Sequence, residues 1–252
     1  MTTIRIIGPG RAGRSFAFAL AAVGVDVIGI LGRDDDASLA ADGVDVLLLA
    51  VPDTAIAEVA AAIRPVSSTV VAHCSGALGL DVLAGHEHVG SLHPLVSLPD
   101  PVIGAARLGS GSSFAVAGDQ SLADLVQALG GRVLEVPPKA RAAYHAAACI
   151  ASNHLVALLG QVQRVAATAG LDLDVFIPLA QGALDDVLLL GPAAALTGPA
   201  ARGDLATIER HRQALEASEL AGYDAGVALA RRLAGAAPPG ELVGSGRSAA
   251  WS

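Results

Sequence analysis

The sequence predicts an α/β domain built on a parallel sheet, followed by an all-α domain. Over residues 1–137, short apolar runs alternate with helical segments, as is typical of a parallel sheet with helices on its faces. A glycine-rich turn follows the first of these runs. After Pro137 and Pro138 the sequence changes to long segments rich in alanine and leucine, so a helical domain is expected over residues 138–235. Residues 236–252 have the composition of a flexible tail.

The elements of the first domain are predicted in order from these patterns. Strands are expected at residues 3–7, 25–31, 45–51, 69–73, 88–92, 113–117 and 132–135. Helices are expected at residues 14–23, 54–63 and 121–129. In the second domain, long helical segments are expected at about 139–169, 174–190 and 205–234.

The net charge and the cysteine spacing argue against several classes of protein. The formal net charge is −8, and the 16 lysines and arginines form no basic run, which argues against binding to nucleic acid or to an anionic membrane surface. Cys74 and Cys149 lack the spacing of a CxxC motif, and the N-terminus does not resemble a signal peptide. A cytoplasmic protein is therefore expected.

Residues 142–160 are apolar and nearly long enough to span a membrane. The polar side chains in this stretch would be costly against lipid but can be satisfied inside a protein. They are Tyr144, His145, Ser152, Asn153 and His154. We therefore expect a central helix of a protein that does not enter a membrane.

The glycine-rich turn matches the pattern GxGxxG, follows an apolar strand and opens a helix. In this setting the glycines allow a tight turn, close approach of a pyrophosphate and close helix packing, which predicts a dinucleotide-binding domain of the Rossmann type. The candidate cofactor-binding residues of the turn are Gly8, Pro9, Gly10, Arg11, Ala12 and Gly13.

The end of the second strand bears on the choice of cofactor. NAD-binding proteins place an acidic residue here for the ribose hydroxyls, whereas this chain has Gly32 and Arg33. The positive charge favours the 2′-phosphate of NADP, although Asp34–Asp36 could oppose it, and Arg33 could also be an ordinary surface residue.

Val51, Pro52 and Asp53 end the next strand, where backbone contacts to the cofactor are expected. On the alternative interpretation, Pro52 only stops the strand and Asp53 only caps the following helix.

Two further strands end in groups that can do chemistry. Ser75 and Gly76 follow one strand, and His93 follows the next, so all three are expected to face the crevice near the nicotinamide. Ser75 and Gly76 are candidates for substrate binding and Ser75 and His93 for catalysis. His93 could equally be a loop histidine before a proline.

On the first long helix, His145, Cys149 and Ser152 share one face, with Asn153 beside it. These polar groups either form hydrogen bonds with one another in the core or line a substrate cleft, and we favour the cleft. His145 is the preferred proton donor for a developing alkoxide, since an imidazole can donate near neutral pH. Asn153, with Ser75, would hold substrate oxygens.

Three other patterns are less specific. Lys139 and Tyr144 offer an alternative proton donor. In the loop from 196 to 204, Thr197 and Arg202 are candidates for substrate binding, Arg202 through a carboxylate. Alternatively, Thr197 and Asp204 only cap helices and Arg202 pairs with a neighbouring acid. No metal site is expected, because the histidines at 86 and 88 lack a further ligand at suitable spacing.

Several motifs together resemble a known family. They are GPGRAG, VPD, HCSG, SLHPL, YHAAACIASNHLVAL and LTGPAARGD, spread between Ile4 and about Ala234. The chain resembles Rossmann-like proteins with a helical C-terminal domain of uncharacterised function, relatives of the 6-phosphogluconate dehydrogenase superfamily. The resemblance implies an oxidoreductase that forms a homodimer through its helical domain.

Within that superfamily the layout is similar to ketopantoate reductase, which has a lysine and, eight residues on, an asparagine on this helix. Here His145 and Asn153 hold those positions, and Ser75 stands where that family has an asparagine. Thr197 and Thr207 only roughly match its substrate loop. The histidine before a proline resembles prephenate dehydrogenases, and the compact helical domain resembles pyrroline-5-carboxylate reductases.

The expected function is NADP-dependent reduction of a small 2-oxo acid, with ketopantoate to pantoate as the specific prediction. The alternatives are an imine reductase like pyrroline-5-carboxylate reductase, a prephenate-type dehydrogenase, and a non-catalytic module that senses NADP.

Overall fold

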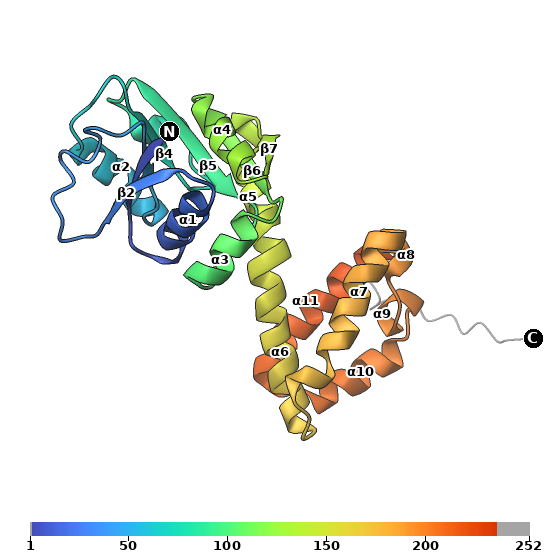
Figure 1. The fold of residues 1–252 in the computed structure, drawn as a ribbon. Helices are drawn as coiled ribbons and strands as arrows, with labels where there is room; N and C mark the ends of the chain where they lie inside the picture. The colour runs from blue at the N-terminus through green and yellow to red at the C-terminus, as the bar shows by residue number, and fades with distance from the viewer. Residues whose placement is uncertain (1, 236–252) are drawn as a thin grey trace, which may run out of the picture. The chain divides into compact units, whose positions relative to one another are not determined.

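The computed structural model describes residues 2–235 (Figure 1). The chain divides between Ser152 and Asn153 into two compact units, which we call the first and second units. The predicted boundary at residues 137 and 138 lies before this division, so the start of the first long helix belongs with the sheet. The predicted tail, residues 236–252, lies outside the described residues.

The first unit contains a sheet with helices on both faces. Its strands are β1 (Thr3–Ile7), β2 (Asp26–Leu31), β3 (Val46–Leu49), β4 (Val70–His73), β5 (His88–Pro94), β6 (Ser113–Gly118) and β7 (Arg132–Glu135). Its α-helices are α1 (Arg11–Ala22), α2 (Asp53–Ala62), α3 (Pro101–Leu108), α4 (Ser121–Ala128) and α5 (Arg141–Cys149). Short 3-10 helices cover Leu80–Leu83 and Pro138–Ala140.

The strands form one sheet in the order β2-β1-β3-β4-β5-β6-β7. β1 to β5 are parallel, and the chain runs outward from β1 first to one side and then to the other. The predicted fold class, a Rossmann-type sheet domain followed by helices, is confirmed. The expectation that the last strands would continue a parallel sheet is wrong for β6 and β7, because β6 runs antiparallel to β5 and β7 runs parallel to β6. After α3 the chain enters the sheet beside the end of β5, where Leu95 N donates to Ser113 O at 2.8 Å.

Apolar side chains pack on both faces of the sheet, as expected for strands with few polar residues. On one face, Ile6 and Leu48 pack with Phe16 of α1 and with residues of α3 and α4. On the other face, Leu47 and Leu49 pack with α2. α1 and α3 lie side by side (Figure 1). The sheet therefore lies between two layers of helices. Polar residues gather at the ends of its strands.

The helix α3 was missed in the sequence. Asp100 caps it, because its carboxylate accepts from the backbone N–H groups of Val102 at 2.9 Å and Ile103 at 3.2 Å. Pro101 occupies the first helical position, where a missing N–H costs nothing. The pair Asp100 and Pro101 was the available signal. The helices predicted at 14–23, 54–63 and 121–129 correspond to α1, α2 and α4, whose ends lie within three residues of the predicted bounds.

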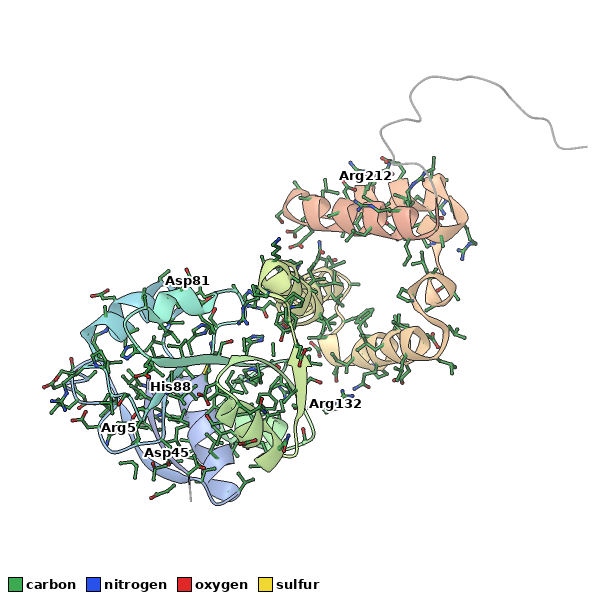
Figure 2. All side chains as sticks on the ribbon, turned by 90° about the horizontal axis from the view of Figure 1, so that it is seen from above. Arg5, Asp45, Asp81, His88, Arg132 and Arg212 are labelled. Carbon is green, nitrogen blue, oxygen red and sulfur yellow. The ribbon has the colours of Figure 1, made fainter. Side chains whose placement is uncertain are left out.

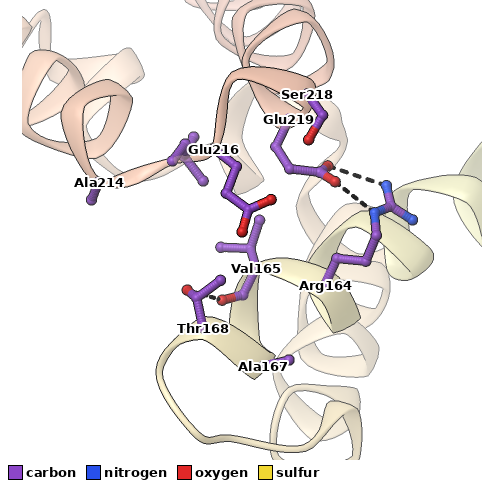
Figure 3. Close-up of a pocket in the computed structure, with 9 residues that line it drawn as sticks. Arg164, Val165, Ala167, Thr168, Ala214, Glu216, Ser218 and Glu219 are labelled. Atoms are coloured by element: carbon purple, nitrogen blue, oxygen red, sulfur yellow. Dashed lines mark hydrogen bonds and ion pairs between the residues drawn. The ribbon is translucent and has the colours of Figure 1, made fainter.

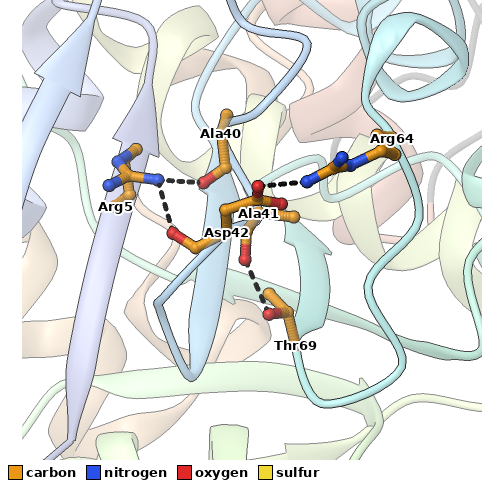
Figure 4. A network of polar contacts seen from close by, with 6 residues as sticks. All are labelled: Arg5, Ala40, Ala41, Asp42, Arg64 and Thr69. Carbon is orange, nitrogen blue, oxygen red and sulfur yellow. Dashed lines mark hydrogen bonds and ion pairs between the residues drawn. The ribbon is translucent and has the colours of Figure 1, made fainter.

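Side chains from several elements hold the long connection between β2 and β3 in place (Figure 4). Arg5 Nη1 donates to the carbonyl oxygens of Ala40 at 2.6 Å and Asp42 at 3.1 Å. Thr69 Oγ1 donates to the carbonyl of Ala41 at 2.8 Å, and Arg64 pairs with the Asp42 carboxylate. These contacts satisfy carbonyls that no strand or helix pairs, so the connection keeps one conformation without regular structure.

The second unit is helical. A π-helical segment, Ile150–His154, runs across the division and leads into α6 (Leu155–Thr168). The others are α7 (Ile177–Leu190), α8 (Pro192–Ala195), α9 (Pro199–Arg202), α10 (Leu205–Ala214) and α11 (Ala217–Leu233), with a 3-10 turn at Leu173–Val175. The segment expected as one helix from 205 to 234 is broken between α10 and α11, where Glu216 is extended.

An ion pair ties α6 to α11 in this unit. Arg164 Nε and Nη2 donate to the two carboxylate oxygens of Glu219 at 2.6 and 3.1 Å (Figure 3). By contrast, several leucines of α7 are exposed to solvent, with Leu188 89% and Leu189 80% exposed. The apolar surface of this unit is thus only partly used within one chain.

One helical stretch among the described residues, Pro138–Thr168, is long and apolar enough to cross a membrane by length and composition alone. It contains the stretch 142–160, which was expected to be a buried central helix. No residue in its most apolar 18-residue window is buried within the chain, so that expectation is not met here.

Candidate active site

The carboxyl ends of the parallel strands form one edge of the first unit. The chain leaves β1 at Gly8, whose N–H donates to Leu31 O of β2 at 2.8 Å. On the other side of β1, Ala50 N donates to Ile7 O at 2.8 Å. The strand order reverses between these two neighbours, and open α/β sheets bind their ligands at such a reversal.

The three glycines of the turn have separate geometric roles. Gly8 has φ +113°, and a Cβ there would lie 2.4 Å from Ala50 O. A Cβ on Gly13 would lie 2.0 Å from Gly8 O, so the helix packs too closely on the turn for any side chain. A Cβ on Gly10 would meet nothing within 4 Å. Gly10 therefore faces open space, next to the uncapped N-terminus of α1.

This geometry fits a dinucleotide pyrophosphate. The first N–H groups of a helix attract anions, and α1 has no acidic residue in its first turn to compete. Arg11, the first residue of α1, is exposed. The open space at Gly10 would leave room for phosphates against the backbone.

The aspartates after β2 are largely occupied by their own loop. Asp35 Oδ2 accepts from Gly32 N at 2.7 Å, and Asp36 Oδ1 accepts from Ser38 N at 2.9 Å. Arg33 is exposed, and no ion pair joins it to an acid within residues 2–235. Its guanidinium is therefore available to a phosphate beyond the end of β2.

Asp53 and Ser75 link the ends of β3 and β4. Asp53 is the first residue of α2; Pro52 holds the capping position and makes no side-chain cap, so the capping interpretation of Asp53 is wrong. The Ser75 hydroxyl donates to Asp53 Oδ2 at 2.7 Å and accepts from Ala77 N at 3.2 Å and Leu78 N at 3.1 Å. The hydroxyl is therefore used by α2 and by its own turn, and Ser75 is only 5% exposed.

His73 is fixed beneath this turn. Its Nδ1 accepts from Ser75 N at 3.1 Å, which leaves the proton on Nε2, 3.1 Å from Gly79 O. Burial above all lowers the pKa of His73. His73 is thus a neutral imidazole in one tautomer, and it holds the turn between Ser75 and Gly79 in place.

His93, Tyr144 and His145 lie together beside Gly76. The Tyr144 hydroxyl is 2.8 Å from His93 Nδ1, and the rings of His93 and His145 meet edge to face with centroids 5.7 Å apart. A Cβ on Gly76 would lie 2.8 Å from His93 Nε2 and 2.7 Å from His145 Cδ2. His93 from the end of β5, with Tyr144 and His145 from α5, therefore brings two imidazoles and a phenol to one place.

The surroundings shift the acidity of this group. Burial, followed by the neighbouring His145 and Arg141, lowers the pKa of His93 from 6.5 to about 4. Burial raises the pKa of Tyr144, while Arg141 acts in the opposite direction. At neutral pH both partners of the His93–Tyr144 hydrogen bond are uncharged. On the other side, His145 Nε2 lies 3.8 Å from Cys149 Sγ.

Arg141 is a member of the cluster that sequence reasoning missed. It is 5% exposed, and its Nη2 donates to Ser75 O at 3.0 Å. Its sequence context, one arginine ahead of Tyr144 and His145 in an alanine-rich helix, was the available signal.

The remaining sequence candidates are Ser152, the last residue of the first unit, and Asn153, Thr197 and Arg202 of the second unit. The helix changes from α to π after Cys149, so the α-helical spacing that predicted a common face for His145 and Ser152, with Asn153 beside it, does not apply there. Ser152 Oγ donates to Ala148 O at 2.7 Å. Thr197 lines an apolar hollow of about 720 Å³ between α6, α10 and α11. Arg202 is exposed.

In the loop after residue 196, the capping interpretation is correct for Asp204 and wrong for Thr197, because Gly198 is the N-cap of α9. Asp204 accepts from Thr207 N at 3.0 Å at the start of α10. A smaller hollow of about 450 Å³ lies beside the Arg164–Glu219 pair (Figure 3). No group of three or more possible metal ligands occurs within residues 2–235.

Comparisons with known proteins agree with this fold. A protein-family profile described as a domain of unknown function, DUF2520, matches residues 114–230, from β6 into α11. No curated protein sequence matches the chain. A solved structure from Bacteroides fragilis, provisionally named an NADP oxidoreductase, is 21% identical, with a TM-score of 0.77 over 93% of this chain and 98% of that one.

Two further solved structures span the same length. The protein TM1727 from Thermotoga maritima is 26% identical over 92% of this chain and 98% of its own, with a TM-score of 0.66. A 1-pyrroline-5-carboxylate reductase from Streptococcus pyogenes is 15% identical over 91% and 98%, with a TM-score of 0.62. The chain thus shares with them a Rossmann-like sheet domain followed by helices, and it carries a region similar to DUF2520.

Proposed function

We propose that this protein is an NADP-dependent oxidoreductase that reduces a small 2-oxo acid, with ketopantoate as the first substrate to test. The observation that carries the proposal is the pairing, along one sheet edge, of an open glycine turn with a cluster of proton-bearing side chains. The fold shared with the B. fragilis protein and with pyrroline-5-carboxylate reductases supports it.

The cofactor would lie along the strand ends. Backbone N–H groups after Gly8 and at Gly10 would hold the pyrophosphate, and Arg33 would bind the 2′-phosphate. Val51–Asp53 would pass beneath it on the far side of the strand reversal. When bound, NADPH supplies the hydride for the carbonyl carbon.

A proton must then reach the carbonyl oxygen. We assign this role to His145, because its ring borders both Gly76 and His93 at the strand ends. The His93–Tyr144 pair is the second candidate: His93 is uncharged at neutral pH, so it would relay the phenol proton rather than supply one as an imidazolium.

The test is titration of NADPH and NADH into the purified protein, followed by NADPH consumption with ketopantoate. We expect His145→Ala to lower turnover while NADPH affinity stays unchanged. His88→Ala is the matched control, because His88 is an exposed histidine at the start of β5, paired with Asp119 at 3.4 Å (Figure 2). Unchanged turnover in His145→Ala, with a large loss in Tyr144→Phe, would move the donor to the His93–Tyr144 pair.

A second candidate function is reduction of a cyclic imine. Structures of pyrroline carboxylate reductases cover nearly all of this chain, and one from Plasmodium falciparum contains NADP. Pyrroline-5-carboxylate, and prephenate for the oxidative direction, belong in the same assay. Tight NADPH binding without turnover of any of them would favour a sensor.

We further propose that the protein is a cytoplasmic homodimer assembled through the second unit. The exposed leucines of α7 support a partner there, because large apolar side chains gathered on one surface mark association sites. Sedimentation equilibrium should give twice the chain mass. A single-chain mass at micromolar concentration would refute the dimer.

A further inference from the structure

The guanidinium of Arg141 is buried without a compensating charge. The residue is 5% exposed, and its Nε is buried and has no hydrogen-bond acceptor. Its one hydrogen bond in the described part of the chain goes to a neutral carbonyl, Ser75 O. No carboxylate among residues 2–235 lies within ion-pair distance of it.

The neighbours of Arg141 do not neutralise it. Tyr144, His73 and His93 lie within its electrostatic reach, and burial keeps each of them uncharged at neutral pH. The nearby carboxylate of Asp53 already accepts the Ser75 hydroxyl. The side of the site that faces α5 therefore has an excess of positive charge.

A buried cation of this kind is costly unless an anion pairs with it. A guanidinium presents its N–H groups as a planar fork that matches the two oxygens of a carboxylate. Here the fork is tied at Nη2, while Nε lacks a partner. A carboxylate beside Arg141 would receive a hydrogen bond in a setting where water competes little.

We propose that Arg141 binds the carboxylate of the substrate, next to His93, Tyr144 and His145. The proposal rests on the proposed reductase function and assigns the carboxylate to Arg141 in place of Arg202. A 2-oxo acid held in this way places its carbonyl one bond from the anchored carboxylate, so the carbonyl oxygen lies near the proton-bearing side chains.

The test uses oxamate, a stable analogue of a 2-oxo acid, and oxamide, which has the same size without the charge. Binding is measured by calorimetry with and without NADPH, for the wild type, Arg141→Lys and Arg141→Met. We expect Arg141→Met to weaken oxamate binding by about 10- to 100-fold and Arg141→Lys by less, since Lys keeps the charge without the fork. Arg132→Met is the matched control, because Arg132 is an exposed arginine on β7 (Figure 2).

The outcomes separate the two proposals. Absence of NADPH binding in the wild type would refute the reductase, whereas Arg141-dependent oxamate binding would still support the anion site. Equal oxamate affinity in wild type and Arg141→Met, or no oxamate binding by the wild type, would overturn the role of Arg141. Inorganic phosphate binding more tightly than oxamate would overturn the carboxylate assignment. A loss of oxamide and oxamate binding by the same factor would show a structural role only, and circular dichroism of both variants checks that they fold.

Discussion

Acid should destabilise the folded protein through His93 more than through an ordinary surface histidine. Folding lowers the pKa of this imidazole from 6.5 to about 4, because it is buried and because His145 and Arg141 repel its proton, while Asp53 only partly opposes them. Between these two pH values the unfolded chain binds a proton at His93 that the folded chain does not. Stability is therefore complete above about pH 6.5 and falls as the pH is lowered toward 4.

The size of the effect follows from the two pKa values. At pH 5 the unfolded imidazole is almost fully protonated and the folded one almost fully neutral, which costs about 2 kcal/mol relative to pH 7.5. His93→Gln removes the titrating group and keeps an acceptor for the Tyr144 hydroxyl. The variant should therefore lose about 2 kcal/mol less than the wild type between these pH values.

Urea unfolding followed by circular dichroism at the two pH values measures how much unfolding free energy each protein loses, and the two losses are then compared. His73 and the other titrating groups are common to both proteins, so their contributions cancel. Equal losses of stability in the wild type and in His93→Gln would show that the cluster does not hold His93 in its neutral form.

Three further substitutions test the glycine turn, the cofactor preference and the packing at Gly76. Gly13→Ala should destabilise the fold by about 1–3 kcal/mol in thermal unfolding, because its methyl group would clash with backbone, whereas Gly10→Ala should keep the fold and weaken NADPH binding. Equal melting temperatures for the two variants would contradict the close packing at Gly13. Arg33→Ala should weaken NADPH binding by about 10-fold or more and leave NADH binding unchanged in fluorescence titrations, since it removes a charged hydrogen bond; a parallel loss for both cofactors would count against the phosphate contact. Gly76→Ala should lower kcat by about 100-fold with NADPH affinity intact, because its methyl group displaces both imidazoles; wild-type turnover would show that their positions do not matter.

Much of the first unit could be predicted because local pattern and burial coincide there. β1 occupies the predicted residues 3–7, since a short apolar run beside a glycine turn has few alternatives. The direction of β6 could not be predicted, because an apolar run looks the same whichever way it pairs. The helix α3 is short, and its capping pair was the only strong local signal.

The site was less accessible to sequence reasoning, because its contacts join distant segments. Ser75, His93 and His145 were singled out individually, and each lies in the cluster. The hydrogen bond of His93 to Tyr144 spans 51 positions, and the contact of Arg141 to Ser75 spans 66. No spacing along the chain indicates such pairs. The π-helical segment also breaks the periodicity on which the grouping with Ser152 and Asn153 depended.

The leucines on α7 have a consequence for how the protein behaves at low abundance. In the proposed homodimer, the second chain that covers Leu188 and Leu189 would bind the folded chain and not the unfolded one, so mass action would make the melting temperature rise with protein concentration. A cell that makes little of this chain would then hold it in a shorter-lived form, more open to proteolysis, than a cell that makes much of it. Expression level would set the lifetime of the protein as well as its amount.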